Sequence, residues 1–359
     1  MDTGDKPVLP ANMEEITMEI DLLTQDILRQ PQVFRSHRQR LLDIPGLTAR
    51  SVPRAASVIF TGIATSLSAI CGNLCLMAEQ GLPSGDMVNT SDLLDYWYPQ
   101  ERDARPLVVV SRSGESAEIL RLLDTIRSDR TVIGITEAPE SPLGRRSSLL
   151  FGFHAEEQAF PNTLSFTLSQ LYLLAVCCGL GYEPSKPLEE LLEELCQAYE
   201  TVFHMTDSGI GRMAAGAGGV LIEGQGPLTG VVTQYALDFH ETRVLGIPVT
   251  GGIMRHGVME LTMRDDIFTL LLIPHDRNAG RKYELALELW NTHHNSAIVT
   301  NSPACQDGPI PTLRLPKVSR DLDALLFTAG MQLIYLSYVK EKGLDRLSPA
   351  LIGKVTRKE

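Results

Sequence analysis

Three serine hydroxyls follow a short apolar run in the segment VVVSRSGESAEILRLLD. Ser111, Ser113 and Ser116 can donate hydrogen bonds to phosphate oxygens, and Gly114 allows a ligand to approach the backbone closely. Arg112 adds a guanidinium that can make a charge-assisted contact. If the apolar run is a strand and the residues after it form a helix, an anion there also meets the positive end of that helix. The segment therefore predicts a phosphate site at the end of a strand.

A second hydroxyl-bearing loop occurs in IFTGIATSLSA, where Thr65 and Ser66 follow Gly62. Ordinary helix capping by Ser and Thr accounts for either loop alone. The carboxyl ends of neighbouring parallel strands meet at one edge of a sheet, which is where ligands bind in open α/β folds. Two such loops side by side therefore predict one phosphate-binding site that both loops share.

Other motifs fit these residues less well. A hydrolase nucleophile elbow needs glycines two positions on either side of its serine, and Ser111 and Glu115 flank Ser113 there. The segment GQGPLTG has the spacing GxGxxxG, which departs from the dinucleotide fingerprint. His256 and Glu260 have the spacing of a metal-binding pair but no evident third ligand. The sequence therefore predicts no metal and no organic cofactor.

The composition is that of a globular chain. Its 359 residues, 43% hydrophobic and 21% charged, suffice for two medium cores. The formal net charge of −12 disfavours nucleic acid and anionic membrane as partners, because both need clustered Lys and Arg. There is no basic and apolar leader, no apolar run of about 18 residues, and no zinc or disulfide pattern among the six cysteines. We therefore expect a cytoplasmic protein.

A series of four apolar, strand-like runs occurs once in each half of the chain. The runs cover residues 57–60, 106–110, 131–135 and 149–153, and then 219–223, 268–273, 296–300 and 312–315. Val58 and Val220 lie 162 residues apart, and Val110 and Ile273 lie 163 apart, so the offset is nearly constant. Short apolar strands that alternate with helices indicate a parallel sheet covered on both faces. The repeat predicts an α/β protein of two tandem, doubly wound domains of flavodoxin-like or Rossmann-like type.

The expected boundaries follow from the spacing of these runs. We expect an N-terminal helical lead-in over residues 1–50, a first domain over 51–185, a helical linker over 186–215, a second domain over 216–345 and an extended tail over 346–359. Both hydroxyl-bearing loops then belong to the first domain, which becomes the predicted phosphate-binding one.

Several segments resemble the tandem sugar-isomerase (SIS) domain proteins. This family includes the isomerase half of glucosamine-6-phosphate synthase, sugar-phosphate deaminases and fructosamine-6-phosphate deglycases. SRSGES resembles its SQSGET segment, IATS resembles its CGTS segment, and PNTLS aligns loosely with its VASTK-like segment. The resemblance covers nearly the whole chain, and the first two segments bind the sugar phosphate in the family. It implies that the substrate-binding residues are Ala64, Thr65, Ser66, Ser111, Arg112, Ser113, Ser116, Thr163 and Ser165.

The resemblance also implies three catalytic residues. LDFHE resembles the family's LKLKE, IMRHGV its ELKHGP, and LIGKVTRKE its LAKSVTVE. Glu241 would then shuttle a proton, His256 would open the sugar ring, and Lys354 would approach the carbonyl. Proton transfer between C1 and C2 of an open-chain sugar uses these residue types: a carboxylate base, a group at the ring oxygen and an amine. In the family this histidine comes from the neighbouring subunit, which implies a homodimer with shared sites, or a tetramer.

The residues alone leave simpler interpretations open. Glu241 could form a surface ion pair with Arg243, His256 could pack within a loop, and Lys354 could be solvated in a charged tail.

Three departures from the family pattern bear on the reaction. The chain enters a helix soon after MDTGDKP without a glutaminase segment, so we do not expect glutamine-driven synthesis. Asp238 and His240 replace the two lysines of LKLKE, and Ala64 replaces the glycine of CGTS. We therefore expect an enzyme that isomerises and deaminates, or deglycates, a 6-phosphorylated amino sugar or fructosamine, releasing a hexose phosphate and an amine. A sugar-phosphate sensor and a simple aldose–ketose isomerase stay open as alternatives.

Overall fold

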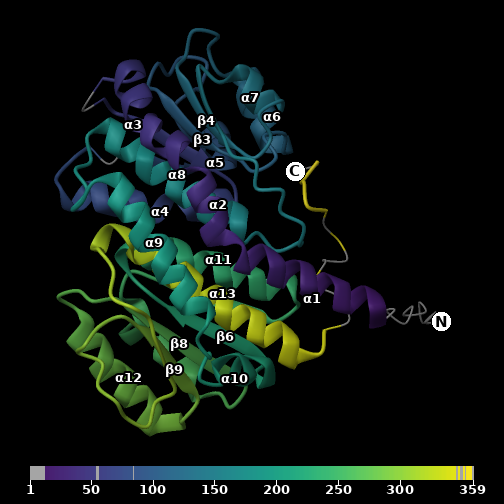
Figure 1. Cartoon of the computed structure of the whole chain (residues 1–359), viewed down its shortest axis with the longest axis vertical. Coiled ribbons are helices and arrows are strands. Elements are labelled where there is room, and N and C mark those ends of the chain that lie inside the picture. The colour runs from purple at the N-terminus through teal and green to yellow at the C-terminus, as the bar shows by residue number, and fades with distance from the viewer. Residues whose placement is uncertain are drawn as a thin grey trace.

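Two five-stranded sheets form the framework of the protein, one in the upper and one in the lower half of Figure 1. The computed structural model describes residues 13–53, 56–83, 85–344, 347, 351 and 353–357. The first sheet contains β1 (Ile59–Gly62), β2 (Asp86–Asn89), β3 (Leu107–Val110), β4 (Val132–Thr136) and β5 (Leu149–Gly152). The second sheet contains β6 (Gly219–Glu223), β7 (Leu245–Val249), β8 (Ile267–Ile273), β9 (Ser296–Thr300) and β10 (Thr312–Arg314).

The two sheets have the same strand order. The first runs β2-β1-β3-β4-β5, and the second, read from β7, runs β7-β6-β8-β9-β10. Every pairing between neighbouring strands is parallel. The predictions of an α/β fold and of parallel sheets are confirmed, whereas the division into two tandem domains stays a prediction. The domain boundaries stay a prediction.

The strands β2 and β7 are not among the apolar runs of the sequence, so they were not predicted. Both lie at the edge of their sheet, and their sequences are DMVN and LGIPV. Pro248 is tolerated in β7 because an edge strand has one side with no neighbouring strand to pair with. Edge strands are half-exposed, so their sequences carry a weaker apolar signal than the fully buried central strands.

Helices cover the sheets on both sides, so that a shared helical layer lies between them (Figure 1). This layer contains α4 (Thr65–Glu79), α8 (Leu164–Leu180), α9 (Leu188–Phe203), α11 (Thr229–Glu241) and α13 (Asp323–Lys342). One hydrophobic cluster runs through this layer and includes Phe60 of the first sheet and Phe268 of the second. Almost every residue of α8 is buried, as expected for a helix covered all round.

The remaining helices lie outside the shared layer or lead into it. On the outer face of the first sheet are α5 (Thr90–Asp95), α6 (Ala117–Thr125) and α7 (Pro142–Arg146), and on that of the second is α12 (Ala279–His293). The chain enters through α1 (Met13–Leu28), α2 (Gln30–Ser36) and α3 (Arg38–Ser51), and α10 (Ile210–Gly216) precedes β6. Short 3-10 turns η1 (Gly226–Leu228), η2 (Ile253–Arg255), η3 (Val258–Met263) and η4 (Arg320–Leu322) complete the described elements.

One helical stretch in the described part of the chain, residues 320–342, is long and apolar enough to cross a membrane by length and composition alone. Its most apolar 18-residue window is 83% buried inside the protein. The stretch contains α13, which packs against α9, α10 and α11. Its apolarity is therefore explained by its place in the core.

The helices α4 and α11 cross at very short distance. A Cβ atom added to Gly230 would lie 2.0 Å from the carbonyl oxygen of Ser68, so only glycine permits this approach. The hydroxyls of Ser68 and Thr233 are 3.0 Å apart across the same crossing. Gly230, Thr233, Leu237 and Glu241 follow one another at intervals of three or four residues, which places them on one face of α11. The crossing therefore brings the end of α11 to the loops of the first sheet.

The C-terminal tail also returns to the first sheet. The described part of the tail, residues 353–357, lies near α6 (yellow in Figure 1), and the backbone N–H of Ala117 donates to the carbonyl of Thr356 over 3.0 Å. Residues 353–357, which form no helix or strand, therefore pack against the segment that the sequence singled out as a phosphate loop.

Candidate functional site

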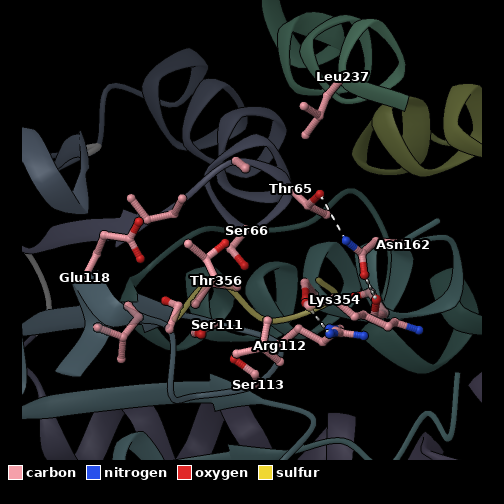
Figure 2. Close-up of a pocket in the computed structure, with 18 of the residues that line it drawn as sticks. Thr65, Ser66, Ser111, Arg112, Ser113, Glu118, Asn162, Leu237, Lys354 and Thr356 are labelled. Carbon is pink, nitrogen blue, oxygen red and sulfur yellow. Dashed lines mark hydrogen bonds between the residues drawn. The ribbon is translucent and has the colours of Figure 1, made fainter. Parts of the chain in front are cut away.

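A cavity of about 190 Å³ lies at the carboxyl end of the first sheet. Its walls come from the loops after β1 and β3, the start of α8, the end of α11 and the C-terminal tail. Figure 2 shows that these segments, distant in the sequence, converge on one space. The predicted site residues that line it are Ala64, Thr65, Ser66, Ser111, Arg112, Ser113, Ser116, Ser165, Glu241 and Lys354.

The loop after β3 is held by its own serines. Ser111 Oγ accepts from Gly114 N–H over 3.1 Å, and Ser113 Oγ accepts from Glu115 N–H over 3.3 Å. Gly114 has φ +63°, and a Cβ atom there would lie 2.0 Å from Ser141 Oγ. Because each serine oxygen accepts in these bonds, its hydroxyl hydrogen is still able to donate. Ser116 is the N-cap residue of α6, and its side chain makes no capping bond. Capping and phosphate binding are therefore compatible in this loop.

The loop after β1 contains a strained residue. Ala64, at the N-cap of α4, has φ +50° and ψ −120°, a conformation that glycine adopts readily and alanine does not. Such a conformation costs of order 1–3 kcal/mol and persists only where the surroundings fix it. The family segment CGTS has glycine at this position, so the departure noted in the sequence coincides with backbone strain at the cavity wall.

Glu241 brings a carboxylate from the second half of the chain to this cavity. Burial raises its pKa to about 7, although the charge of Lys354 opposes the shift. One helical turn earlier, Asp238 is buried, and burial together with the charge of Glu241 raises its pKa well above the usual value. Within the described residues Glu241 forms no ion pair, so the surface ion pair with Arg243 is not found. A carboxylate with such a pKa is suited to general base chemistry near neutral pH.

Lys354 lines the cavity, and backbone carbonyls hold the end of its side chain. Its Nζ donates to the carbonyl of Glu157 over 3.2 Å and to that of Ala159. Arg112 Nη2 donates to the carbonyl of Lys354 itself over 2.8 Å, and Figure 2 shows the two side chains next to each other. Burial lowers the pKa of Lys354, and the carboxylate of Glu157 opposes that shift. The alternative of a solvated tail lysine is wrong.

Glu157 was not predicted, and it explains the position of Thr163. Its Oε1 accepts from Thr163 N–H over 2.7 Å and from the Thr163 hydroxyl over 3.2 Å, and its Oε2 accepts from Ser165 Oγ over 2.6 Å. Thr163 therefore turns away from the cavity, contrary to the expectation that it lies at the ligand, whereas Ser165 does line it. The signal in the sequence was a pair of acids before PNTLS, but nothing there showed which acid points inward.

Two further residues line the cavity without having been predicted. Glu118 is 7% exposed, and its Oε2 has no hydrogen-bond partner among the described residues. Asn162 Nδ2 donates to Thr65 Oγ1 over 3.4 Å, the upper dashed line in Figure 2. Both stand next to predicted motifs, Glu118 two residues after SRSGES and Asn162 within PNTLS.

His256 is not brought to this cavity. It follows η2 in the second half, is exposed, and is absent from the cavity walls. Glu260 is exposed too. Across the described part of the chain, no group of three or more His, Cys, Asp or Glu side chains could hold a metal ion.

The corresponding edge of the second sheet has different chemistry. A cavity of about 590 Å³ there is lined by residues that include Gln225, Asp276 and Arg320. Arg320 is already paired with Glu79 and Asp323. Its described lining contains no serine or threonine, in contrast to the cavity of the first sheet.

Several solved structures of sugar-phosphate enzymes have the same fold as this chain. The C-terminal domain of glucosamine-fructose-6-phosphate aminotransferase from Francisella tularensis matches with a TM-score of 0.77 at 16% identity, covering 91% of this chain and 98% of that one. Glucosamine-6-phosphate deaminase from Thermotoga maritima matches at 0.72 and 16%, covering 95% and 99%. Tagatose-6-phosphate ketose/aldose isomerase from Escherichia coli matches at 0.69 and 19%, covering 97% and 98%.

These likenesses establish the fold over almost the full length of each chain. No protein-family model matches the sequence, and no curated protein matches it. At 16–19% identity the chain has the fold of these sugar-phosphate enzymes. A shared fold does not determine substrate or reaction, which depend on the residues of the site.

The strain at Ala64 can be tested by substitution. We expect Ala64→Gly to raise the free energy of unfolding by about 1 kcal/mol, because relief of strain in the folded state exceeds the entropy that glycine adds to the unfolded chain. Urea unfolding of both proteins measures the difference. A loss of about 0.5–1 kcal/mol, the usual result of replacing alanine by glycine, would contradict the strained conformation.

Proposed function

We propose that this protein is an enzyme that moves a proton between C1 and C2 of a 6-phosphorylated amino sugar or fructosamine and releases a hexose phosphate and an amine. The observation that carries the proposal is the carboxylate of Glu241, with a pKa of about 7, on the same cavity as the amine of Lys354 and two hydroxyl-bearing loops. The proposed chemistry uses no metal and no organic cofactor, and we propose a cytoplasmic location.

The phosphate would be held by the two loops of the first sheet. Thr65 and Ser66 open α4, and Ser111, Ser113 and Ser116 precede α6, so hydroxyl donors and the positive ends of two helices face one region. Arg112 contributes the positive charge nearest these hydroxyls in sequence. The proposal assigns the phosphate to neutral donors and one guanidinium, which leaves the carboxylates for the sugar.

Glu241 would act as the base. Removal of the C2 proton from the open-chain form of a 2-amino sugar, and its return to C1, converts the C1 aldehyde and C2 amine into a C2 imine. Water hydrolyses the imine to a ketose phosphate and ammonia. A fructosamine reacts in the opposite sense: C1 loses the proton, C2 gains it, and hydrolysis at C1 releases the amine. Lys354, which lines the same cavity, would approach the carbonyl.

The histidine for ring opening would come from a second copy of the chain. His256 is exposed and lies outside the cavity of its own chain. Leu245, Ile253, Leu261 and Met263, on β7 and the turns around His256, are exposed apolar side chains. A homodimer that covers this face and shares its sites, or a tetramer built from such dimers, is therefore part of the proposal.

Glu241→Gln tests the base. We expect this variant to lose turnover of the responding sugar phosphate while binding it with unchanged affinity in calorimetry, since the amide keeps the shape and cannot accept the proton. In the parent protein, kcat/KM should rise as the pH increases through about 7, because the carboxylate must be deprotonated to act. Normal turnover by the variant, or a pH profile without a rising limb, would remove Glu241 from the mechanism.

Ser113→Ala tests the phosphate position. We expect the affinity for the responding sugar phosphate to fall by about 1 kcal/mol, the usual net value of one hydrogen bond. Titration with the unphosphorylated sugar is the control, and its weak binding should not change. An unchanged affinity for the phosphorylated ligand would place the phosphate elsewhere.

A further inference from the structure

The loop of residues 155–159, between β5 and α8, is fixed from one side by the N-terminal helix α1. Asp26 Oδ2 accepts from the backbone N–H groups of Gln158 and Ala159 over 2.8 and 2.7 Å. Arg29 Nη2 donates to the carbonyls of Ala155 and Glu156, each over 2.7 Å. Two side chains one helical turn apart therefore bind four backbone groups of this loop.

The same loop holds Lys354 from its other side. The carbonyls of Glu157 and Ala159 accept from Lys354 Nζ. Ala159 links the two sides directly, because its N–H donates to Asp26 while its carbonyl accepts from Lys354. A shift of this residue would therefore change the position of the lysine amine in the cavity.

Asp26 is buried, and it is paired with Arg29, whose side chain is 31% exposed. Asp26 is 1% exposed, and its Oδ1 accepts from Arg29 Nη2 over 2.8 Å and from Arg29 Nε over 3.1 Å. A buried carboxylate with four N–H donors is stabilised by charge-assisted bonds, and the loss of its charge affects all of them.

The backbone that this unit holds is strained. Glu156 has φ +50°, a value that residues other than glycine seldom adopt. Its carbonyl accepts from Arg29, so the arginine binds the strained residue itself. Without that bond, relaxation of the loop to another conformation would relieve the strain and lower its energy.

From these contacts we infer that Asp26 and Arg29 are positioning residues for Lys354. They act through the loop of residues 155–159. The end of α1 and the residue that follows it therefore help to position the lysine amine at the candidate site. The catalytic consequence rests on the proposed function, whereas the position of the lysine does not.

Selective labelling of amines tests the inference without any substrate. The full-length protein is treated with an acetylating N-hydroxysuccinimide ester, and the rate at Lys354 is followed by peptide mass spectrometry relative to the other lysines. We expect Asp26→Asn to raise the rate at Lys354 about five-fold, as the loss of one net hydrogen bond would. Asp21→Asn, on the exposed side of the same helix, is the matched control and should leave the rate unchanged.

A second variant guards against a folding defect in the first. Arg29→Lys keeps the charge but loses the fork that reaches Ala155 and Glu156, and it should also raise the rate at Lys354. Where a sugar phosphate is turned over, both variants should lower kcat with little change in KM. Rates at Lys354 equal to the parent in both folded variants would overturn the inference. A parent protein that turns over no sugar phosphate would refute the proposed function and leave the labelling result to decide this one.

Discussion

The close crossing of α4 and α11 is the constraint on which the arrangement of the site depends. The crossing is possible because Gly230 has no side chain where the Ser68 carbonyl lies. It brings one face of α11, which begins in the second half of the chain, against the helix that starts at the first hydroxyl-bearing loop. Glu241, at the end of that face, thereby reaches the cavity of the first sheet. Without this contact each half would hold only part of the candidate site.

Charge balance inside the cavity follows from burial. Glu241 and Lys354 each lose hydration, so the pKa of the acid rises and that of the amine falls. The charge of Lys354 limits the rise for Glu241, and the charge of Glu157 limits the fall for Lys354. The Glu157 carboxylate offsets the positive charge of Lys354. Its two oxygens accept hydrogen bonds from Thr163 and Ser165. The hydroxyl-bearing loops add neutral donors and the one positive charge of Arg112. Such a site can hold an anionic ligand and still keep a carboxylate near its working pKa.

The sequence predicts the central strands and the two hydroxyl-bearing loops well, because buried parallel strands are continuous apolar runs and the loops after them carry a local pattern. It fails for β2 and β7, whose edge positions weaken that pattern. Most predicted site residues meet at one cavity, but Thr163 turns to Glu157 instead. Asp26 could not be predicted, since its role depends on contacts with Gln158 and Ala159, more than a hundred residues away. The bonds of Glu157 to Thr163 and Ser165 are local, but the sequence does not show whether Glu156 or Glu157 makes them. His256 stays a prediction, because a single chain does not place it.

Hydrogen–deuterium exchange at the sugar is the most direct test of whether the protein moves a proton between C1 and C2. Proton NMR in deuterated water would follow the C1 and C2 protons of the 6-phosphates of glucosamine, galactosamine, fructose and fructosyl-amino acids in the presence of the protein. We predict that one of these ligands loses its C1 or C2 proton signal at a rate that depends on the protein concentration. Tight binding of a sugar phosphate without any such exchange would contradict an enzyme and indicate a sugar-phosphate sensor built on the same fold.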